Sequence, residues 1–373
     1  MNVVIILPTY NERESIEILL DALHKEAKNI PHHTCSYLVV DDFSPDGTGD
    51  IIRAYRKKHN DTYLLEGKKE GLGKALLRGM TYAVAKLHAD YILQMDCDLS
   101  HDPARVPAFI DGLDNGADFV VGSRYIKGGS IPANWGIHRK IFSIVGNAIV
   151  RFGLGFTYVH DWTGGFRAYA VKYYHQLKDQ MKAYSGYVFQ IAFLHKAIGE
   201  GAHVVEVPIH FTDRKFGHSK IAPAEYIKNV LLYVGTARLT SVVHGSFGKF
   251  LVVGGIGFVL NAVLLVIFHD YFNWSAAGAN FLGAVVAIFS NYNLNNYWTF
   301  QKDKMTTIGS YVSKLFQFYV TSIFGVLVIQ TGTIAFGVKL FGDHLYFVYF
   351  LIGTGLLLVW NYTVYSKMIW KKK

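Results

Sequence analysis

Two aspartates one residue apart, Asp96 and Asp98, follow a predicted buried strand. The strand is the apolar run Tyr91–Met95, and Pro103 can occupy the first turn of a helix beyond it, where its missing N–H costs nothing. In an extended or turning chain, both carboxylates can reach one hard cation. Mg²⁺ takes one or two protein carboxylates and completes its shell with water and phosphate oxygens. The pair therefore predicts either a metal–diphosphate site or an acidic loop that only caps a helix.

The elements that must position these aspartates alternate between strand and helix. The first apolar run is continuous, as is typical of a strand buried on both faces of a parallel sheet. The alternation predicts a doubly wound, largely parallel α/β sheet, and the polar motifs follow strand ends, where such sheets bind ligands. The predicted strands are Val3–Leu7, Tyr37–Val40, Thr62–Leu65, Tyr91–Met95 and Asp118–Gly122, and the predicted helices are Ser15–Lys28, Gly49–Lys58 and Ala75–Lys86.

The last third of the 373-residue chain has a different composition. Residues 247–373 contain nine Lys or Arg, three acidic residues and no glutamate. Four charge-free stretches of 19 to 31 residues are long enough to cross a hydrocarbon core about 30 Å thick. The sequence therefore predicts an all-α domain of four transmembrane helices, at about 248–268, 276–298, 315–338 and 345–366.

Charge predicts the orientation of this membrane protein and excludes one class of partner. Most basic residues near the spans flank the first, separate the second from the third, or follow the last, so the positive-inside rule places both termini and residues 1–246 in the cytoplasm. We expect no signal peptide, and two cysteines suit a reducing compartment. Residues 1–246 hold 28 basic and 25 acidic residues, so the net charge of +9 lies mostly beside the membrane and no nucleic-acid partner is expected.

Motifs along the chain carry a family resemblance. The first set is Pro8-Thr-Tyr-Asn-Glu12, Val40-Asp-Asp42 with Ser44, Asp46 and Gly47, Met95–His101, and Gly122-Ser-Arg-Tyr125. These resemble family 2 glycosyltransferases, whose GT-A fold is Rossmann-like. A second set is Arg139–Ser143, Thr163–Arg167 and Asp213–Lys220. It resembles the polyprenyl-phosphate sugar synthases of the dolichyl-phosphate mannose synthase type. Residues 247–366, through Gly248–Gly255 and Asn291–Phe300, resemble the GtrA-like four-helix membrane domain.

The resemblance implies a nucleotide-sugar donor site. Nucleobase and ribose would lie against the first motif and the end of the second strand, where carboxylates can accept their hydrogen bonds. A divalent cation, Mg²⁺ or Mn²⁺, would be held on the diphosphate by Asp96 and Asp98, with Ser100 where some relatives have glutamine. The implied catalytic residues are Asp96, Asp98, Arg124 and Arg214. The implied donor-binding residues are Pro8, Tyr10, Glu12, Val40, Asp42, Asp96, Cys97, Asp98, Arg124, Arg214 and Lys220.

The implied acceptor is a lipid monophosphate. Arginine forks and a hydroxyl suit its oxygens, and the implied residues are Arg124, Arg139, Ser143 and Arg214. Residues 139–152 alternate basic and apolar side chains, as a helix in the membrane interface would, and residues 225–240 are a second candidate. Packing against the sheet is the alternative for both. The expected domains are a catalytic domain at 1–220, an interfacial helix or linker at 221–246 and a membrane domain at 247–373.

The function implied is inverting transfer of mannose from GDP-mannose to dolichyl or polyprenyl monophosphate at the cytoplasmic membrane face, which gives a lipid-linked donor for glycosylation. A UDP-glucose-dependent polyprenyl-phosphate glucosyltransferase fits the same acceptor motifs. The membrane domain would either anchor the enzyme or translocate the lipid-linked sugar, and its asparagines would join helices or line a path. Asp161 would position a sugar hydroxyl or cap a turn; the residue pattern leaves both open.

Overall fold

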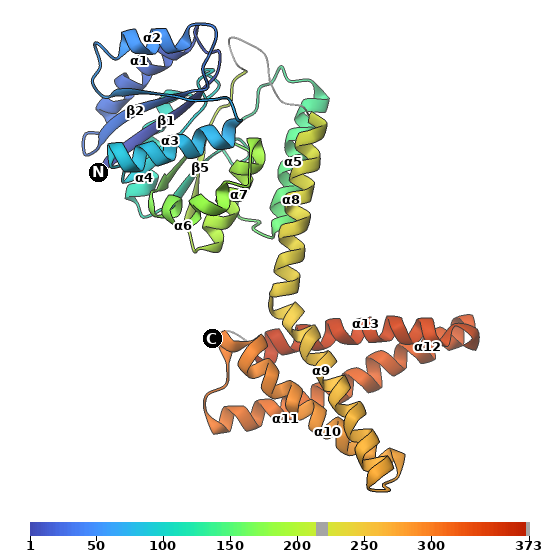
Figure 1. The fold of residues 1–373 in the computed structure, drawn as a ribbon. Coiled ribbons are helices and arrows are strands. Elements are labelled where there is room, and N and C mark those ends of the chain that lie inside the picture. Colours follow the sequence, from blue (N-terminus) through green and yellow to red (C-terminus); the bar gives the residue numbers. More distant parts are fainter. Residues whose placement is uncertain (214–222, 371–373) are drawn as a thin grey trace. The chain divides into compact units, whose positions relative to one another are not determined.

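The computed structural model describes residues 1–213 and 223–370 of the chain. The chain forms two compact units, Met1–Arg238 and Leu239–Lys373. The first unit holds a β-sheet flanked by helices, and the described elements of the second are all helical (Figure 1). The division falls within α8 (Pro223–His244), which occupies most of the segment predicted as an interfacial helix or linker. The predicted order of an α/β domain followed by an all-α domain is confirmed.

A seven-stranded sheet forms the centre of the first unit, with strand order β3-β2-β1-β4-β6-β5-β7. The strands are β1 (Asn2–Thr9), β2 (Thr34–Asp41), β3 (Thr62–Glu66), β4 (Tyr91–Gln94), β5 (Phe119–Ser123), β6 (Arg167–Ala170) and β7 (Val204–Pro208). Neighbours are parallel except at β6, which runs antiparallel to both β4 and β5. The largely parallel sheet predicted from the sequence is therefore confirmed, with one strand reversed.

Strands β6 and β7 were not among the predicted strands. β6 has four residues and begins with the fully buried Arg167, so no apolar run marks it. β7 carries Glu206 at its centre, and this glutamate accepts hydrogen bonds from the loop that precedes β6. Both strands carry polar side chains that serve the site described below, which explains why hydrophobic patterning did not find them.

Helices cover both faces of the sheet. They are α1 (Ile16–Glu26), α2 (Thr48–Tyr55), α3 (Leu72–Leu87), α4 (Val106–Asp114), α6 (Lys172–Met181) and α7 (Gly186–Gly199), with 3-10 turns at Ala27–Asn29 and Pro103–Arg105. α3, α6 and α7 pack on one face, and α1, α2 and α4 pack on the other (Figure 1). In α1 the buried residues are Ile16, Leu19, Leu20 and Leu23, the spacing of a helix that buries one side.

Strand β1 lies between β2 and β4 in the interior of the sheet. Val4 and Ile6 enter the apolar cluster that includes α3, α6 and α7. Val3, Ile5 and Leu7 enter the cluster on the opposite face. None of these five side chains is more than 1 % exposed. Burial on both faces explains why this strand forms a continuous apolar run instead of alternating with polar residues.

Helices α5 (Ile137–Leu154) and α8 run side by side (Figure 1). A β-carbon at Gly153 would collide with Val234, so glycine allows their close approach. One side of α5, with Val150 and Leu154, belongs to the core cluster. Its other side is apolar and exposed, at Ile137, Ile141, Phe142, Ile144, Val145 and Phe152. The packing alternative is therefore confirmed for one side of α5, and contact of its exposed apolar side with the membrane interface stays a prediction.

The second unit contains helices at all four predicted spans. They are α9 (Ser246–Val266), α10 (Ala276–Leu294), α11 (Ile308–Phe324), α12 (Thr331–Phe341) and α13 (Tyr346–Val364), with π-helical segments at Ile267–Tyr271, Asn295–Thr299, Gly325–Gln330 and Tyr365–Ile369, and 3-10 turns at Gln301–Asp303 and Asp343–Leu345. Among the described residues, Ser246–Tyr271 and Ile308–Phe341 are long and apolar enough to cross a bilayer. The third predicted span is thus one longer helical segment, in which a π-helical stretch joins α11 to α12.

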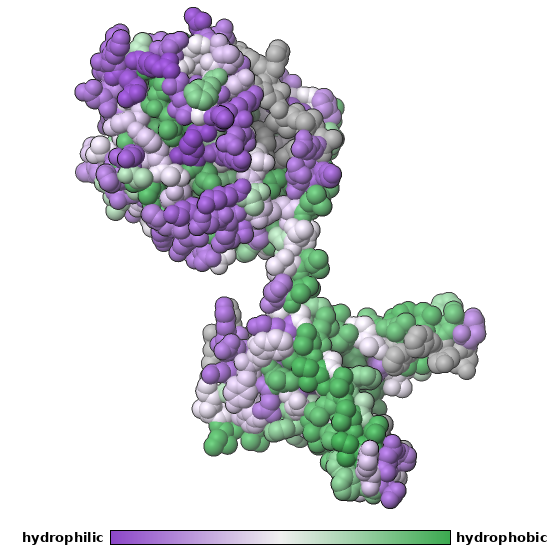
Figure 2. All heavy atoms as spheres, viewed as in Figure 1, coloured by the Kyte–Doolittle hydropathy of each residue, from purple (hydrophilic) through white to green (hydrophobic). Residues whose placement is uncertain are grey.

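Large apolar side chains cover the outside of this unit. Phe258, Phe316 and Leu351 are 75 %, 70 % and 54 % exposed, and apolar residues dominate the visible surface of the helices (Figure 2). An apolar surface of this extent is rare on soluble monomers and marks contact with lipid or protein. Exposed apolar helices therefore agree with the membrane domain predicted from the sequence.

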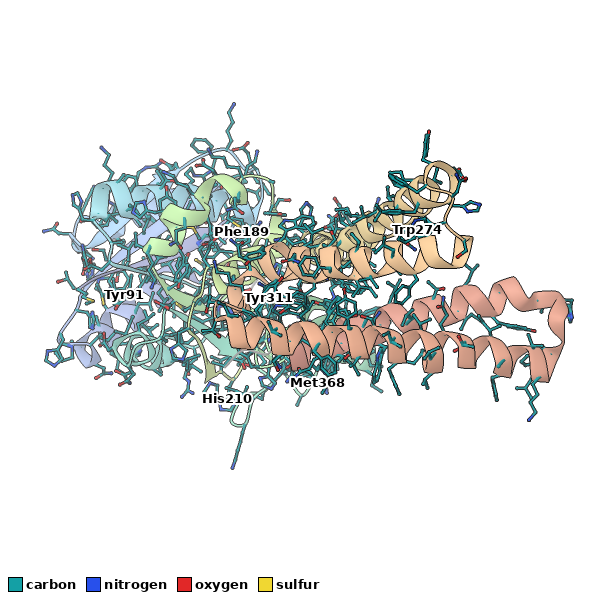
Figure 3. The ribbon with its side chains drawn as sticks, turned by 90° about the horizontal axis from the view of Figure 1, so that it is seen from below. Tyr91, Phe189, His210, Trp274, Tyr311 and Met368 are labelled. Atoms are coloured by element: carbon teal, nitrogen blue, oxygen red, sulfur yellow. The ribbon has the colours of Figure 1, made fainter. Side chains whose placement is uncertain are left out.

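An aromatic cluster closes one end of the second unit. Phe300 and Trp370 stack with ring centroids 4.8 Å apart at its centre. Figure 3 shows Tyr311 and Met368 at this end of the unit and Trp274 at the opposite end. The charge-free helices thus have one end that is fixed by packed aromatic rings, as expected of a bundle whose helices meet there.

Candidate active site

The strand order creates a topological switch point between β1 and β4. From β1 the chain winds outward through β2 and β3, whereas β4 pairs with the other side of β1. Loops after such neighbouring strands diverge, and open α/β sheets bind ligands in the crevice that results. Tyr10 and Glu12 follow β1, and Asp96 and Asp98 follow β4. The structure therefore brings the predicted donor and metal residues to one edge of the sheet.

Asp96 and Asp98 are each positioned by a neighbour in the turn after β4. The Asp96 N–H donates to His101 Nδ1 at 3.0 Å, so Nδ1 is the unprotonated nitrogen of this buried ring. Burial lowers the pKa of His101, which favours the neutral ring that this hydrogen bond requires. Asp98 Oδ1 accepts from the N–H and the hydroxyl of Ser100, at 3.0 and 2.5 Å. The Asp96 side chain is 39 % exposed, whereas Asp98 is buried.

The sequence left open that this acidic loop only caps a helix. In the structure a third aspartate has that role. Asp102 Oδ1 accepts from the Ala104 N–H at 3.0 Å, and Pro103 occupies the first position of the 3-10 turn, as predicted. Asp102 is thus the N-cap of this turn. The carboxylates of Asp96 and Asp98 are not needed for capping: Asp98 accepts from Ser100, and Asp96 lies beside Gly165.

The residues present fit a hard divalent cation. Carboxylate and hydroxyl oxygens are the ligand type that Mg²⁺ and Mn²⁺ prefer. A β-carbon at Gly165 would lie 3.3 Å from Asp96 Oδ1, so glycine keeps the space beside this carboxylate wide. The Ser100 hydroxyl donates its proton to Asp98, and its oxygen keeps lone-pair capacity. Asp96, Asp98 and Ser100 could therefore hold the metal of the predicted nucleotide-sugar site.

Hydrogen bonds join the loops after β1 and β2. The Asn11 N–H donates to Ser44 Oγ at 2.9 Å, and the Glu12 N–H donates to Thr48 Oγ1 at 3.1 Å. Ser44 in turn donates to the Asp41 carboxylate through both its N–H and its hydroxyl. The two loops that the nucleobase and ribose would contact are thus fixed relative to one another.

Two basic side chains meet residues predicted to bind the donor. Arg78 Nη2 donates to Asp42 Oδ1 at 2.6 Å, and Lys69 Nζ lies 3.5 Å from the centre of the Tyr10 ring. Burial raises the pKa of Asp42, and the Arg78 guanidinium opposes that shift. Lys69 and Arg78 were not predicted from the sequence, because no local motif distinguishes them and only the fold brings their partners near.

Two other residues predicted to bind the nucleotide sugar, Cys97 and Val40, are buried. The Cys97 thiol is buried 3.3 Å from Thr9 Oγ1, and burial raises its pKa well above the usual value. Val40 is fully buried and pairs with Pro8 in the β1–β2 ladder. Any donor contact made by Cys97 or Val40 would therefore use the backbone.

Arg124 follows β5 and forms a two-point ion pair with Asp161. Arg124 Nε and Nη2 donate to the two carboxylate oxygens at 2.7 and 2.8 Å, and Nη2 also donates to Thr163 Oγ1 at 2.8 Å. Asp161 is fully buried and also accepts from the Thr163 and Gly164 N–H groups. Burial alone would raise the pKa of Asp161, but Arg124 holds it below the usual value. Asp161 therefore caps this turn and orients Arg124.

The loop that carries Asp161 is held by a second buried arginine. Arg167 is fully buried and donates to the carbonyls of Gly164, Trp162 and Gln190. Burial lowers its pKa to about 10. Sequence reasoning placed Arg167 in a family motif without giving it a role; its role in the fold is to satisfy three carbonyls that would otherwise be buried without donors.

The predicted acceptor residues lie along α5 and the loops beside it. Ser143 Oγ lies 2.5 Å from the Tyr125 hydroxyl, and Asn147 Nδ2 donates to both Ser143 O and Thr163 Oγ1. Because Thr163 also contacts Arg124, these bonds bring Ser143 and Arg124 into one network. Asn147 was missed, since a lone helical asparagine carries no motif.

Arg139 lies at the start of α5 in a separate cluster. Its guanidinium lies 3.9 Å from the centre of the Trp135 ring and pairs with Asp213 Oδ1 at 3.1 Å. The Trp135 indole also donates to Asp213, at 2.6 Å. Two other predicted residues, Arg214 and Lys220, come after Asp213 in the chain and lie outside the described residues.

Two family models match the chain. "Glycosyl transferase family 2" matches residues 4–178, and "GtrA/DPMS, transmembrane domain" matches residues 249–370. The first range covers the strands and loops that carry Tyr10, Asp96 and Arg124, and the second covers the helices of the second unit. The two predicted domain types are therefore both found, in the predicted order.

Three curated relatives have related names. Polyprenol monophosphomannose synthase of Mycolicibacterium smegmatis is 37 % identical over 58 % of this chain and 80 % of its own length. Dolichol-phosphate mannosyltransferase of Pyrococcus furiosus is 28 % identical over 99 % of both chains. Undecaprenyl-phosphate mannosyltransferase of Micrococcus luteus is 35 % identical over 60 % of this chain and 88 % of its own. The similarity to the Pyrococcus protein therefore includes both units.

The buried ion pair gives a stability prediction. Asp161→Asn keeps the shape of the side chain but removes the charge opposite Arg124, which is only 8 % exposed. Breaking one side of a buried pair costs about 3–5 kcal/mol, so we expect the Tm of the detergent-solubilised full chain to fall by roughly 6 °C or more. The matched control is Asp213→Asn, in the exposed pair with Arg139, where a small change is expected. Equal Tm shifts in the two variants would contradict this assignment.

Proposed function

The chain belongs to glycosyl transferase family 2, among the polyprenyl-phosphate mannose synthases that carry a GtrA/DPMS membrane domain, and from this membership we propose a specific reaction. The protein transfers mannose from GDP-mannose to a dolichyl or polyprenyl monophosphate, with inversion at the anomeric carbon. Transfer takes place at the cytoplasmic face of the membrane, and its product is a lipid-linked mannose donor.

The observation that carries this proposal is that two aspartates and an arginine follow strands that end at the same edge of the sheet. Asp96 and Asp98 follow β4, and Arg124 follows β5. Because β6 lies between these two strands and is antiparallel to both, β4 and β5 run in the same direction and end at the same edge. A cation held by carboxylates can neutralise a donor diphosphate, and an arginine can bind the oxygens of an acceptor phosphate. The choice of mannose and of a polyprenyl acceptor is supported by the names of the relatives.

The acceptor supplies the nucleophile in this mechanism. A phosphate monoester is mostly ionised near neutral pH, since its second pKa is about 6, and its oxygen attacks the anomeric carbon as the nucleoside diphosphate departs from the opposite side. The protein must align these groups more than it must remove a proton. When bound, a divalent cation on Asp96 and Asp98 would neutralise charge on the departing diphosphate.

The side chains around Arg124 position the acceptor phosphate. The Asp161 carboxylate fixes the plane of the guanidinium, so the orientation of Arg124 is set before the lipid arrives. Hydrogen bonds from Asn147 to Thr163 and to the Ser143 carbonyl link Arg124 to the segment that carries the Ser143 hydroxyl, which supports Ser143 as a second contact of the same phosphate. Because these side chains are already ordered, less conformational entropy is lost when the phosphate binds.

The exposed apolar side of α5 supports delivery of the lipid from the membrane interface. Ile141, Phe142 and Val145 are 53 %, 61 % and 47 % exposed, and Arg139 and Lys140 lie on the same helix. Apolar residues mixed with basic ones favour a helix that lies among anionic headgroups. Together with the distribution of basic residues near the spans, this supports a cytoplasmic location for the catalytic unit and both termini.

Removing one carboxylate tests the metal assignment. We expect Asp98→Ala to abolish mannosyl transfer in detergent with Mg²⁺ or Mn²⁺, by at least about 100-fold, because the donor diphosphate loses its counter-charge. The control is Asp102→Ala, four residues along the same loop, which removes only the cap of a short turn and should retain most activity. Near-normal turnover by a folded Asp98→Ala protein would exclude Asp98 as a metal ligand.

Offering two donors tests the nucleotide and the sugar. Full-length protein is given GDP-mannose or UDP-glucose with a polyprenyl phosphate, and lipid-linked product is measured by mass spectrometry. We expect product with GDP-mannose and none with UDP-glucose. Product with UDP-glucose alone would keep the phosphate chemistry and assign the protein to the glucosyl branch instead.

Truncating an arginine tests the acceptor side. Arg139→Ala should raise the KM for the lipid phosphate about tenfold while leaving the KM for the nucleotide sugar unchanged, because one charge-assisted hydrogen bond is lost. Lys140→Ala removes an equal charge from the adjacent residue, whose ammonium donates to Ala133 O, and should change neither KM more than about twofold. A similar effect of both variants would indicate general membrane attraction in place of a specific phosphate contact.

A further inference from the structure

Two histidines and an aspartate meet at the edge of the sheet opposite the candidate active site. His24 lies in the last turn of α1, and His59 and Asp61 lie in the loop between α2 and β3. Asp61 directly precedes β3, whereas Tyr10 and Asp42 follow the ends of β1 and β2, which run parallel to β3. One potential ligand atom from each of the three side chains lies within 4.8 Å of the others. The group is therefore compact and separate from the residues assigned to transfer.

Backbone hydrogen bonds fix the loop that carries His59 and Asp61. The Thr62 N–H donates to His59 O at 3.2 Å and closes a turn, and the Tyr37 N–H of β2 donates to Asp61 O at 2.9 Å. His24 comes from a helix whose buried side packs in the core of the same unit. Two separately anchored elements therefore bring the three side chains together before any ligand binds.

Both ring nitrogens of His24 face oxygen atoms that accept hydrogen bonds. Nδ1 lies 2.8 Å from Leu20 O, and Nε2 lies 3.0 Å from Asp61 Oδ1. The Tyr55 hydroxyl, 3.2 Å from Nδ1, donates to Asp21. A neutral imidazole can donate from only one nitrogen, so the second contact needs either a further proton or a metal ion between Nε2 and the carboxylate. Metal-binding histidines usually donate their other N–H to a carbonyl or carboxylate, as Nδ1 can to Leu20 O.

The second histidine favours the metal ion over the further proton. The His59 ring stacks on Tyr55 with centroids 4.3 Å apart and lies 4.6 Å from the His24 ring, and within the described part of the chain its nitrogens have no hydrogen-bond partner. A protonated His24 would leave these nitrogens without a protein partner, whereas a metal ion can take one nitrogen from each ring. The side chains of His24 and Asp61 are 20 % and 45 % exposed, so an ion can enter from solvent.

The types of ligand atom select a transition metal. Two imidazoles and a carboxylate suit Zn²⁺, which binds histidine nitrogen and aspartate oxygen at about 2.0–2.2 Å. Ligand atoms around tetrahedral zinc with such bonds lie roughly 3.3 Å apart, close to the 3.0 Å between His24 Nε2 and Asp61 Oδ1. Mg²⁺ and Ca²⁺ prefer oxygen ligands, which are the kind that Asp96 and Asp98 offer. The two sites therefore differ in the metal that they favour.

We propose that His24, His59 and Asp61 bind a Zn²⁺ ion, with water as the remaining ligand, and that this ion joins α1 to the start of β3. The ion is distinct from the divalent cation proposed for the donor diphosphate. It stabilises the first unit and takes no part in transfer, because the residues assigned to the two substrates follow the opposite ends of the strands. Its binding can therefore be measured without turnover.

Zinc binding to the full-length protein in detergent is measured by competition with a chromogenic zinc chelator, in an excess of Mg²⁺ that occupies the oxygen site. We expect one Zn²⁺ per chain. His59→Gln should weaken its affinity at least about 100-fold, since changing even an outer partner of a metal ligand costs about 10–100-fold. The matched control is His32→Gln, at an exposed histidine outside the group, which should leave the affinity unchanged. No zinc binding by the wild-type protein, or equal affinities of the two variants, would overturn the proposal.

A second pair of variants tests the carboxylate. Asp61→Asn keeps the shape of the side chain and removes its charge, so we expect zinc affinity to fall at least about tenfold. Asp50→Asn, in an exposed ion pair with Arg53, should leave it unchanged. Asp98→Ala should also bind zinc as the wild-type protein does. Loss of zinc binding in Asp98→Ala with retention in Asp61→Asn would assign the ion to the donor site and contradict the proposal.

Hydrogen exchange measured by mass spectrometry locates the ion within the chain. Zn²⁺ should slow amide exchange in α1 and in residues 56–66 of the wild-type protein, and it should not do so in His59→Gln. Slower exchange confined to the loop after β4 would instead place the ion at the donor site. Mannosyl transfer is measured in parallel and should be equal in His59→Gln and the wild-type protein. Zinc binding by a protein without mannosyl transfer would count against the proposed function alone, and transfer without zinc binding against this inference alone.

Discussion

The active unit depends on a carboxylate that is fully buried and paired with arginine. Asp161 accepts from the backbone and guanidinium of Arg124 and from two N–H groups of its own turn. A buried charge of this kind is tolerated only if its hydrogen bonds are complete. The loop after β5 and the loop before β6 are therefore held in one geometry, and Glu206 of β7 fixes the same loop by accepting from the His160 and Asp161 N–H groups.

This constraint explains the reversed strand in an otherwise parallel sheet. β6 runs antiparallel between β4 and β5, so its start lies beside their carboxyl ends. The turn that carries Asp161 thereby reaches the edge where Asp96 and Arg124 are located. Gly165 also belongs to that turn and lies against Asp96. One short strand thus connects the acidic and basic halves of the site, which a uniformly parallel strand at this place would separate.

Some buried polar side chains of the second unit have no described hydrogen-bond partner. Buried polar groups in a membrane domain find partners on neighbouring helices, as Asn293 does with Tyr311. Asn291, Asn295 and Asn361 have buried Oδ1 atoms without a described hydrogen-bond partner, and the amides of Asn291 and Asn361 lie against Gly257 and Gly325 of neighbouring helical segments.

The amino-acid sequence predicted the α/β and all-α units, the helices of the four spans, and the strand-end positions of Asp96, Asp98 and Arg124. These features follow from apolar periodicity, charge-free length and residue type, which are local properties. The folded structure alone reveals the direction of β6, the pairing of Arg124 with Asp161, and the approach of Lys69 and Arg78 to Tyr10 and Asp42. Likewise it distinguished satisfied from unsatisfied asparagines. Each of these depends on which distant segments meet, and a polar side chain carries no local signal of the partner it will find.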